Sequence, residues 1–116
     1  MDIRLQEALD FSNYRLTLTT QLQNLKIKLA SDLLVTHANG IFTASMNNIT
    51  LVGTLMETHD SFYVIDDSGT PIQIPNLKEF RKLLFDTYST ATNTYAEEYN
   101  KLVKSRNIKK IVNYDE

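Results

Sequence analysis

The stretch Asp67-Ser68-Gly69-Thr70 has the residue types of a catalytic motif. An Asp-Ser/Thr-Gly-Ser/Thr run after an apolar strand presents the catalytic carboxylate of retroviral-type aspartic proteases, in which two carboxylates in close contact share one proton. The surrounding sequence does not support this chemistry, because no glycine follows Gly69 and the rest of the chain predicts a long helix instead of a β-rich scaffold. We therefore interpret the run as a hairpin turn, and an aspartyl hydrolase is the remotest alternative.

Acidic residues near this turn could also ligate a metal, since hard cations prefer oxygen ligands. The candidates lie close together in the sequence: Glu57, His59, Asp60, Asp66 and Asp67. Their spacing does not match an EF-hand loop, and the chain has no cysteine for a thiolate site or a disulfide. The glycine-rich turns that bind nucleotide phosphates are absent as well. We expect no catalytic residue, metal, cofactor or small-molecule substrate.

A basic segment near the C-terminus could contact nucleic acid. Its cations are Lys101, Lys104, Arg106, Lys109 and Lys110. They could neutralise phosphates while Tyr95 or Tyr99 stacks on an exposed base. Cations are also favourable at a helix C-terminus, where they oppose the macrodipole, and Glu97 and Glu98 dilute the positive charge. Nucleic-acid binding is therefore the alternative hypothesis and not the leading one.

The outer thirds of the chain predict two long helices. In the first, over residues 1–31, apolar residues recur at steps of three and four: Phe11, Tyr14, Leu18, Leu22, Leu25 and Leu29. In the second, over residues 76–106, the stripe comprises Leu77, Phe80, Leu84, Tyr88, Ala91, Tyr95, Tyr99 and Leu102. Asn76 and Glu79 resemble a capping box at its start. Residues 107–116 are expected to form a tail.

The middle third, residues 32–75, predicts two β-hairpins and contains all of the glycines and prolines. Asn39-Gly40 favours a hairpin because both residues tolerate positive φ, and Asp67–Gly69 separates a second pair of apolar runs. Residues 46–57 fit a strand or a short helix capped by Ser45, and we favour the helix. Its apolar side would comprise Ile49, Val52, Leu55 and Met56. The expected fold is α+β in one domain over 1–116, with two hairpins around a short helix forming a small antiparallel sheet between long terminal helices.

The composition is that of an ordinary globular chain. Of the 116 residues, 42% are hydrophobic and 22% charged, and the net charge of −2 indicates no particular partner. No stretch has the length and apolar character of a membrane span, and the N-terminus lacks the pattern of a signal peptide. We expect neither secretion by a signal peptide nor a membrane-spanning segment.

Four stretches, spread over most of the chain, read "ALDFSNYRLTLTTQLQNLKIKL", "HANGIF", "DDSGTPIQIPNLKEF" and "EEYNKLVKSRNIKK". Together they resemble a class of small, uncharacterised proteins encoded by large contractile-tailed bacteriophages and their cyanophage relatives. The class has no assigned catalytic residues, so no residue role is transferred. The resemblance implies a viral setting, in the host cytoplasm or the virion, for an assembly component or a small binding protein.

The leading hypothesis is a non-enzymatic interaction or assembly module that oligomerises or docks through its long helices. Two helices of this length each span about 40 Å, which is more than a sheet of short strands can cover. Part of each stripe must therefore pack on the other helix or on another chain. The residues expected at this helix–helix contact are Leu18, Leu22, Leu25, Tyr88, Tyr95 and Tyr99. The expected partner is a protein, either the chain itself or a larger assembly.

Overall fold

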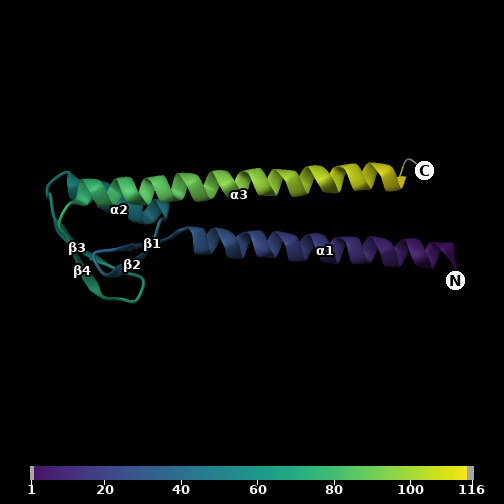
Figure 1. Cartoon of the computed structure of the whole chain (residues 1–116), viewed down its shortest axis with the longest axis horizontal. Coiled ribbons are helices and arrows are strands. Elements are labelled where there is room, and N and C mark those ends of the chain that lie inside the picture. Colours follow the sequence, from purple (N-terminus) through teal and green to yellow (C-terminus); the bar gives the residue numbers. More distant parts are fainter. Residues whose placement is uncertain (1, 115–116) are drawn as a thin grey trace. The chain divides into compact units, whose positions relative to one another are not determined.

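The computed structural model describes residues 2–114, with side chains described for residues 2–105. In chain order the elements are α1 (Ile3–Asp32), β1 (Leu34–His37), β2 (Gly40–Thr43), α2 (Met46–Met56), β3 (Phe62–Ile65), β4 (Pro71–Ile74) and α3 (Leu77–Tyr114) (Figure 1). This order confirms the predicted α+β fold: a long helix, a hairpin, a short helix, a second hairpin and a long helix.

The chain divides into two compact units. The β unit, Leu29–Asn93, contains both hairpins, α2 and the adjoining ends of α1 and α3. The helical unit comprises Met1–Lys28 and Thr94–Glu116, and its described part is a helical hairpin of α1 and the C-terminal part of α3.

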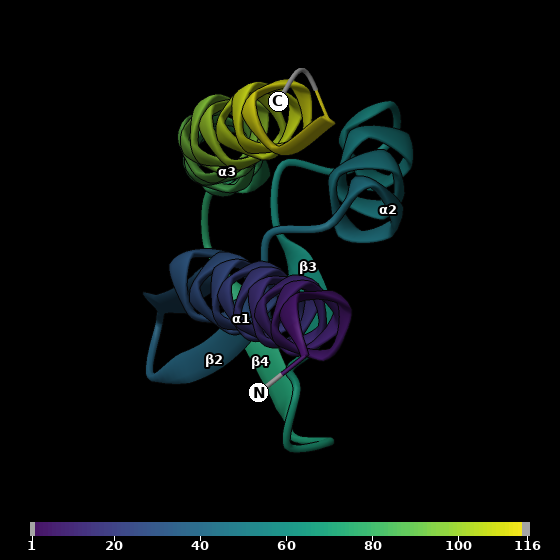
Figure 2. The same cartoon turned by 90° about the vertical axis from the view of Figure 1, so that its right-hand side faces the viewer.

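Phe80, on α3, is fully buried in the core of the β unit and contacts two other rings. Its ring stacks on His37 of β1 with 5.0 Å between centroids, and it meets Phe42 of β2 edge-on at 4.8 Å. Figure 2 shows α2 beside α3, with the strands below both helices. The buried cluster draws on both hairpins and both helices: Val35, Phe42, Ala44, Ile49, Val52, Val64, Ile74, Leu77, Phe80 and Leu84.

Each hairpin is a two-stranded antiparallel sheet of its own, so the predicted single sheet is in fact two. A turn, and not strand pairing, links the hairpins. The Asp67 N–H donates to the Ile41 carbonyl at 2.8 Å, and the Ile41 N–H donates to Asp66 Oδ2 at 3.2 Å. The N–H and carbonyl of Ile41 on β2 are therefore hydrogen-bonded to the β3–β4 turn. In a single sheet, a neighbouring strand would have made these two bonds.

The turn of the first hairpin lies one residue earlier than the sequence predicted. Positive φ falls at Ala38 (50°) and Asn39 (68°), so these two residues occupy the centre of a primed turn, and His37 pairs with Gly40. Gly40 is needed for a different reason. A Cβ at this position would lie 2.7 Å from Ile72 Cγ1 of the second hairpin. The glycine permits the close approach of the two hairpins.

Residues 46–56 form the favoured short helix α2, and the alternative strand is excluded. Ser45 is the N-cap, with extended backbone, and its Oγ accepts a hydrogen bond from the Asn48 N–H at 3.2 Å. The residues packed in or against the core are the four predicted: Ile49, Val52, Leu55 and Met56. The predicted cap and apolar side are both confirmed.

The third helix, α3, begins at the predicted cap and continues past its predicted end. The Glu79 N–H donates to Asn76 Oδ1 at 3.1 Å, and the Leu77 N–H donates to the Asp60 carbonyl at 3.0 Å, so two amides at the helix N-terminus are satisfied. The helix runs to Tyr114, whereas the sequence predicted an end at residue 106 and a tail over 107–116. No glycine or proline follows Pro75, so the sequence contains no strong helix breaker in this region.

In the helical unit, α1 includes three threonines with little intrinsic helix propensity. Thr17, Thr19 and Thr20 each donate a hydrogen bond from Oγ1 to the carbonyl four residues earlier, at 2.9, 2.9 and 3.0 Å. These bonds satisfy the hydroxyls within the helix itself. The predicted long N-terminal helix is confirmed.

Candidate functional site

The turn from Asp66 to Thr70 contains the motif that resembles a catalytic one. Asp66 is buried, and its carboxylate accepts hydrogen bonds from the Thr70 N–H at 2.8 Å, the Ser68 Oγ–H at 2.9 Å, the Ser68 N–H at 3.1 Å and the Ile41 N–H at 3.2 Å. The bond from the Thr70 N–H is the main cause that lowers the pKa of Asp66; burial opposes it, and the bonds from Ser68 and Ile41 reinforce it. Asp66 is therefore an ionised acceptor that closes the turn and attaches it to β2.

Asp67, at the position of the catalytic residue in the motif, is attached to the first hairpin. Its Oδ2 accepts from Thr43 Oγ1 at 2.7 Å. Gly69 has a φ of 83°, so the turn uses its glycine for a left-handed conformation. The predicted hairpin turn is confirmed. The role of Asp66 was not predicted, although an aspartate at a turn commonly accepts from the backbone N–H two residues later, as in an Asx turn.

The other candidate metal ligands do not converge. In the part of the chain that the structure describes, no group of three or more His, Cys, Asp or Glu side chains is placed to hold a metal ion. His59 Nδ1 lies 2.8 Å from Thr58 Oγ1, and its ring centroid lies 4.8 Å from that of Phe62. The proximity of these acids in the sequence does not produce a shared site.

Two cations of the basic segment have described side chains, and one of them is near a carboxylate. Lys101 Nζ lies 4.0 Å from Glu98 Oε1, and Lys104 is exposed. The rings of Tyr95 and Tyr99 lie 6.0 Å apart. The side chains of the other three predicted cations lie outside the described residues: Arg106, Lys109 and Lys110.

The six residues predicted at a helix–helix contact differ in exposure. Leu18 is buried in the helical unit, and Tyr88 packs against the core of the β unit. Leu22, Leu25 and Tyr95 are half-buried, and Tyr99 is 41% exposed. Most of the predicted stripe is therefore covered to some degree, and the largest exposed apolar surface of α1 lies elsewhere.

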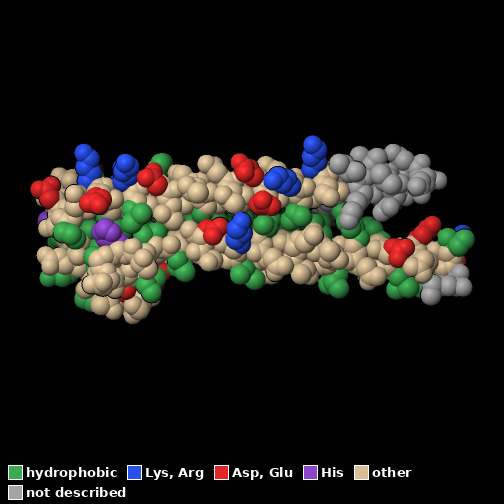
Figure 3. Space-filling view, viewed as in Figure 1, with side chains coloured by type: hydrophobic (Ala, Val, Ile, Leu, Met, Phe, Trp, Pro, Cys, Tyr) green, Lys and Arg blue, Asp and Glu red, His purple; other side chains and the backbone are tan. Residues whose placement is uncertain are grey.

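A second row of apolar side chains, which we call the outer line, follows the opposite side of α1 from Leu18. Its members, each 44–67% exposed, are Leu5, Leu9, Leu16 and Ile27. Leu5, Leu16 and Ile27 are eleven residues apart, which is three helical turns, so they lie almost directly above one another. In Figure 3, hydrophobic side chains protrude at intervals along α1. This row is not evident from the sequence, because polar residues such as Ser12, Thr20 and Gln23 occupy the intervening steps of three and four between its later members.

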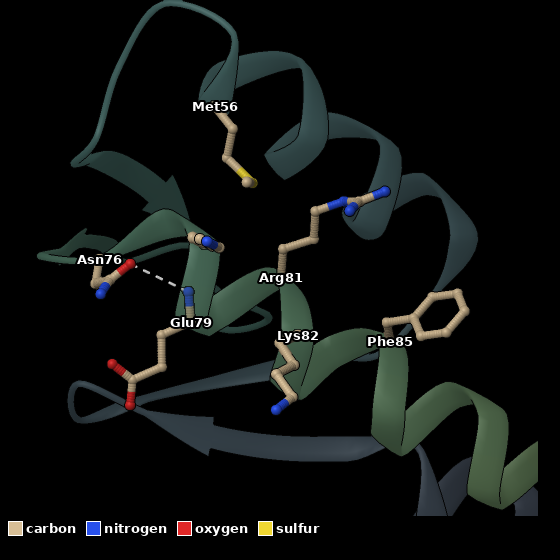
Figure 4. Close-up of a pocket in the computed structure, with 7 residues that line it drawn as sticks. Met56, Asn76, Glu79, Arg81, Lys82 and Phe85 are labelled. Carbon is tan, nitrogen blue, oxygen red and sulfur yellow. Dashed lines mark hydrogen bonds between the residues drawn. The ribbon is translucent and has the colours of Figure 1, made fainter.

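A groove of about 530 Å³ lies within the β unit, between the C-terminal end of α2 and the first turns of α3. Figure 4 shows Met56 pointing from α2 towards α3, and Arg81 reaching from α3 towards α2. A Cβ on Gly53 would lie 3.2 Å from Arg81 Nε, so the glycine leaves room for this side chain against α2. The groove is lined by Met56, Asn76, Lys78, Glu79, Arg81, Lys82 and Phe85.

The groove combines apolar surface with positive charge. Phe85 is 51% exposed. Lys78, Arg81 and Lys82 against Glu79 give three positive charges and one negative charge, a net charge of +2. The ion pair between Lys101 and Glu98 is the only one among residues 2–105, so the groove cations have no carboxylate partner in that range. These residues were not predicted as a site from the sequence, because the groove forms only where α2 packs beside α3.

Comparison with protein-family models, with curated proteins and with solved structures finds no match. Within residues 2–114, no helix combines the length and the apolar character that crossing a membrane requires. The class that the structure defines is thus an α+β protein with a helical hairpin, and its function must be argued from its surfaces.

Proposed function

We propose that this protein is a non-enzymatic assembly module that self-associates through the outer line of α1. The observation that carries the proposal is a row of large apolar side chains that remains exposed along a helix of 30 residues. Apolar side chains aligned on one side of a helix are the arrangement through which helices pack on one another. The resemblance to small phage proteins favours a virion or its assembly as the setting.

The dimensions of the outer line support association between copies. From Leu5 to Ile27 it extends over 22 residues, or about 33 Å of helix. Full burial of one Leu or Ile side chain is worth about 1.5–3 kcal/mol, so a few such residues from each copy can offset the entropic cost of association.

Removing the apolar character of the line tests the proposal. The double variant Leu16→Gln with Ile27→Gln keeps helix propensity and removes two of its four side chains. The matched control, Thr17→Gln with Asn24→Gln, alters exposed polar positions of the same helix. Light scattering coupled to size-exclusion chromatography, over a series of protein concentrations, should show an oligomer for the parent and the control and a monomer for the double variant.

A parent chain that remains monomeric over the whole series would reject self-association. A mobility-shift assay with DNA and RNA provides the contrast with the alternative function. A complex that weakens steeply with salt and is lost on Lys101→Gln with Lys104→Gln would favour nucleic-acid binding.

A further inference from the structure

A second row of side chains, which we call the cationic row, runs beside the outer line of α1. Leu5, Leu16 and Ile27 are each directly preceded by a cation, so a cation followed by Leu or Ile recurs every eleven residues. Consecutive residues of a helix differ by about 100° in direction, and eleven residues make about three turns, so these cations form a straight row. The members of the cationic row, all exposed, are Arg4, Arg15 and Lys26.

The opposite flank of the outer line, which we call the neutral side, is polar and uncharged. Its residues lie about 60–100° round the helix from Leu16, on the side away from the cationic row. All four are exposed: Gln6, Asn13, Thr17 and Asn24. Asp10 and Lys28, one of each sign, lie further round the helix. Asp2 precedes the line and caps α1 by accepting from the Arg4 N–H at 3.0 Å.

We propose that the outer line packs against the outer line of a second copy, and that the two α1 helices run parallel and in register. This inference rests on the proposed self-association and adds the direction and the alignment of the pair. Each member of the line then contacts the same residue of the second copy. The cationic row of each copy lies along the neutral side of the other.

The apolar residues match best when the helices are parallel. In register, the four members of the line each meet their own counterpart, so all four pairs are apolar. The best antiparallel alignment is centred on Leu16 and pairs Leu5 with Ile27, but it places Leu9 opposite Gln23. Burial of an amide against a leucine leaves its hydrogen-bonding groups without partners, which is costly. In the parallel pair two Gln23 amides meet, and each can donate to the other.

The cationic row disfavours the antiparallel pair. Turning one helix end to end brings the same flank of both helices together, so Arg15 would face Arg15 of the second copy and Arg4 would face Lys26. Like charges on adjacent helical positions are destabilising, and such repulsion selects against the arrangement that requires it. In the parallel pair opposite flanks meet, and the cations lie beside amide and hydroxyl oxygens that can accept hydrogen bonds.

The spacing of eleven lets this contact continue along most of α1. It corresponds to about 3.67 residues per turn, against about 3.6 for a straight helix, so the line drifts by only about 20° from Leu5 to Leu16 and again to Ile27. Two helices can therefore keep the line between them over about 33 Å with little supercoiling. The four apolar pairs thus belong to one continuous contact.

Disulfide trapping tests the direction of the pair, because the chain contains no cysteine. Ser12 and Thr20 lie on the side of the outer line, between its members, and their substitution leaves the line intact. In the parallel pair each meets its own counterpart, and the two positions are about 12 Å apart along the axis, beyond the reach of a disulfide. In the antiparallel pair Ser12 meets Thr20.

Under mild oxidation, Ser12→Cys alone and Thr20→Cys alone should each give a linked homodimer. An equal mixture of the two variants should give the same homodimers in large excess over a linked heterodimer, as measured by mass spectrometry. The matched control is Gln21→Cys, an exposed position about 140° round the helix from Leu16, and it should give little linked dimer.

The possible outcomes separate this inference from the proposed function. A linked heterodimer of Ser12→Cys with Thr20→Cys as the main product would overturn the parallel pair and leave the proposed function standing. A parent that is monomeric in light scattering rejects both. An associating parent that traps no dimer at either position would place the contact elsewhere and overturn both as well.

Acidic substitutions on the neutral side give a second test, with opposite signs for the two directions. In Gln6→Glu with Asn24→Glu, the parallel pair places the new carboxylates beside Arg4 and Lys26 of the second copy. Association should then strengthen about three- to tenfold at low salt. In an antiparallel pair the same carboxylates would face each other, and association would weaken.

Sedimentation equilibrium measures this change, and the gain should disappear at high salt because the charges are screened. The matched control, Asn24→Gln, keeps the neutral side uncharged and should retain parental association. Unchanged or weaker association of the acidic variant at low salt would contradict the parallel pair.

Discussion

At the scale of single residues, Asp66 joins the two hairpins of the β unit. Its carboxylate accepts from Ser68 and Thr70 within its own turn and from Ile41 on β2. All of these partners donate, so only the ionised acid, with acceptor positions alone, satisfies them together. The acid that directly precedes the motif-like run Asp67–Thr70 is thereby explained as part of the scaffold.

This arrangement predicts acid sensitivity through Asp66. Its pKa is lowered in the folded chain, so its contribution to the free energy of unfolding is fully present above the ordinary carboxyl pKa and is lost as pH falls through the lower, folded-state value. We expect Asp66→Asn to be less stable than the parent at neutral pH and to lose less stability below about pH 4. Urea denaturation across a pH series measures both effects.

The control for this experiment is Asp86→Asn, at an exposed position of α3. It should retain the acid-dependent loss of the parent. If the Asp66→Asn curve runs parallel to the parent curve from pH 7 to pH 2, the carboxylate of Asp66 does not cause the acid sensitivity.

At the scale of elements, α3 depends on the Asn76 cap. The Glu79 N–H would lose its acceptor in Asn76→Ala, and removal of such a cap costs about 1 kcal/mol. Asn76→Asp keeps an oxygen at the same position and should retain most of the stability. Chemical denaturation of the two variants measures the difference, and equal stability of Asn76→Ala and Asn76→Asp would show that the cap contributes nothing.

Local chemistry explains which elements could be predicted from the sequence. The helices, the Ser45 and Asn76 caps and both hairpins depend on neighbouring residues, and they were predicted. The position of the first turn at Ala38-Asn39 was not, because Gly40 is required by Ile72 of the other hairpin and not by the turn. Long-range contacts of this kind leave no periodic pattern in the sequence.

The candidate surfaces were less predictable than the fold for the same reason. A stripe at steps of three and four shows which side of a helix is apolar, and it led to Leu18 and its neighbours. The exposure of a side chain depends on tertiary packing, which the sequence pattern does not specify. The exposure of Leu16 and Ile27 was therefore known only from the structure. The groove is likewise lined by Met56 of α2 and Phe85 of α3, which are 29 residues apart in the sequence.

At the scale of the whole molecule, α1 carries a row of apolar side chains, the outer line, that the chain itself leaves exposed. Under the proposed self-association, copies of this chain meet through the outer line, so no second kind of protein is needed for assembly. Association then adds to stability, because the partner binds the folded chain and not the unfolded one.

This linkage predicts a melting temperature that depends on protein concentration. Tenfold more protein should raise the melting temperature of the parent by roughly 3–8 °C, since a factor of ten in binding is worth about 1.4 kcal/mol. Leu16→Gln with Ile27→Gln should be monomeric and should therefore melt at one temperature at all concentrations. Its intrinsic stability should change little, because both positions are exposed. Added salt should leave the dependence of the parent in place, because screening does not weaken an apolar contact. A parent whose melting temperature does not change with concentration, measured by circular dichroism and calorimetry, would argue against assembly through α1.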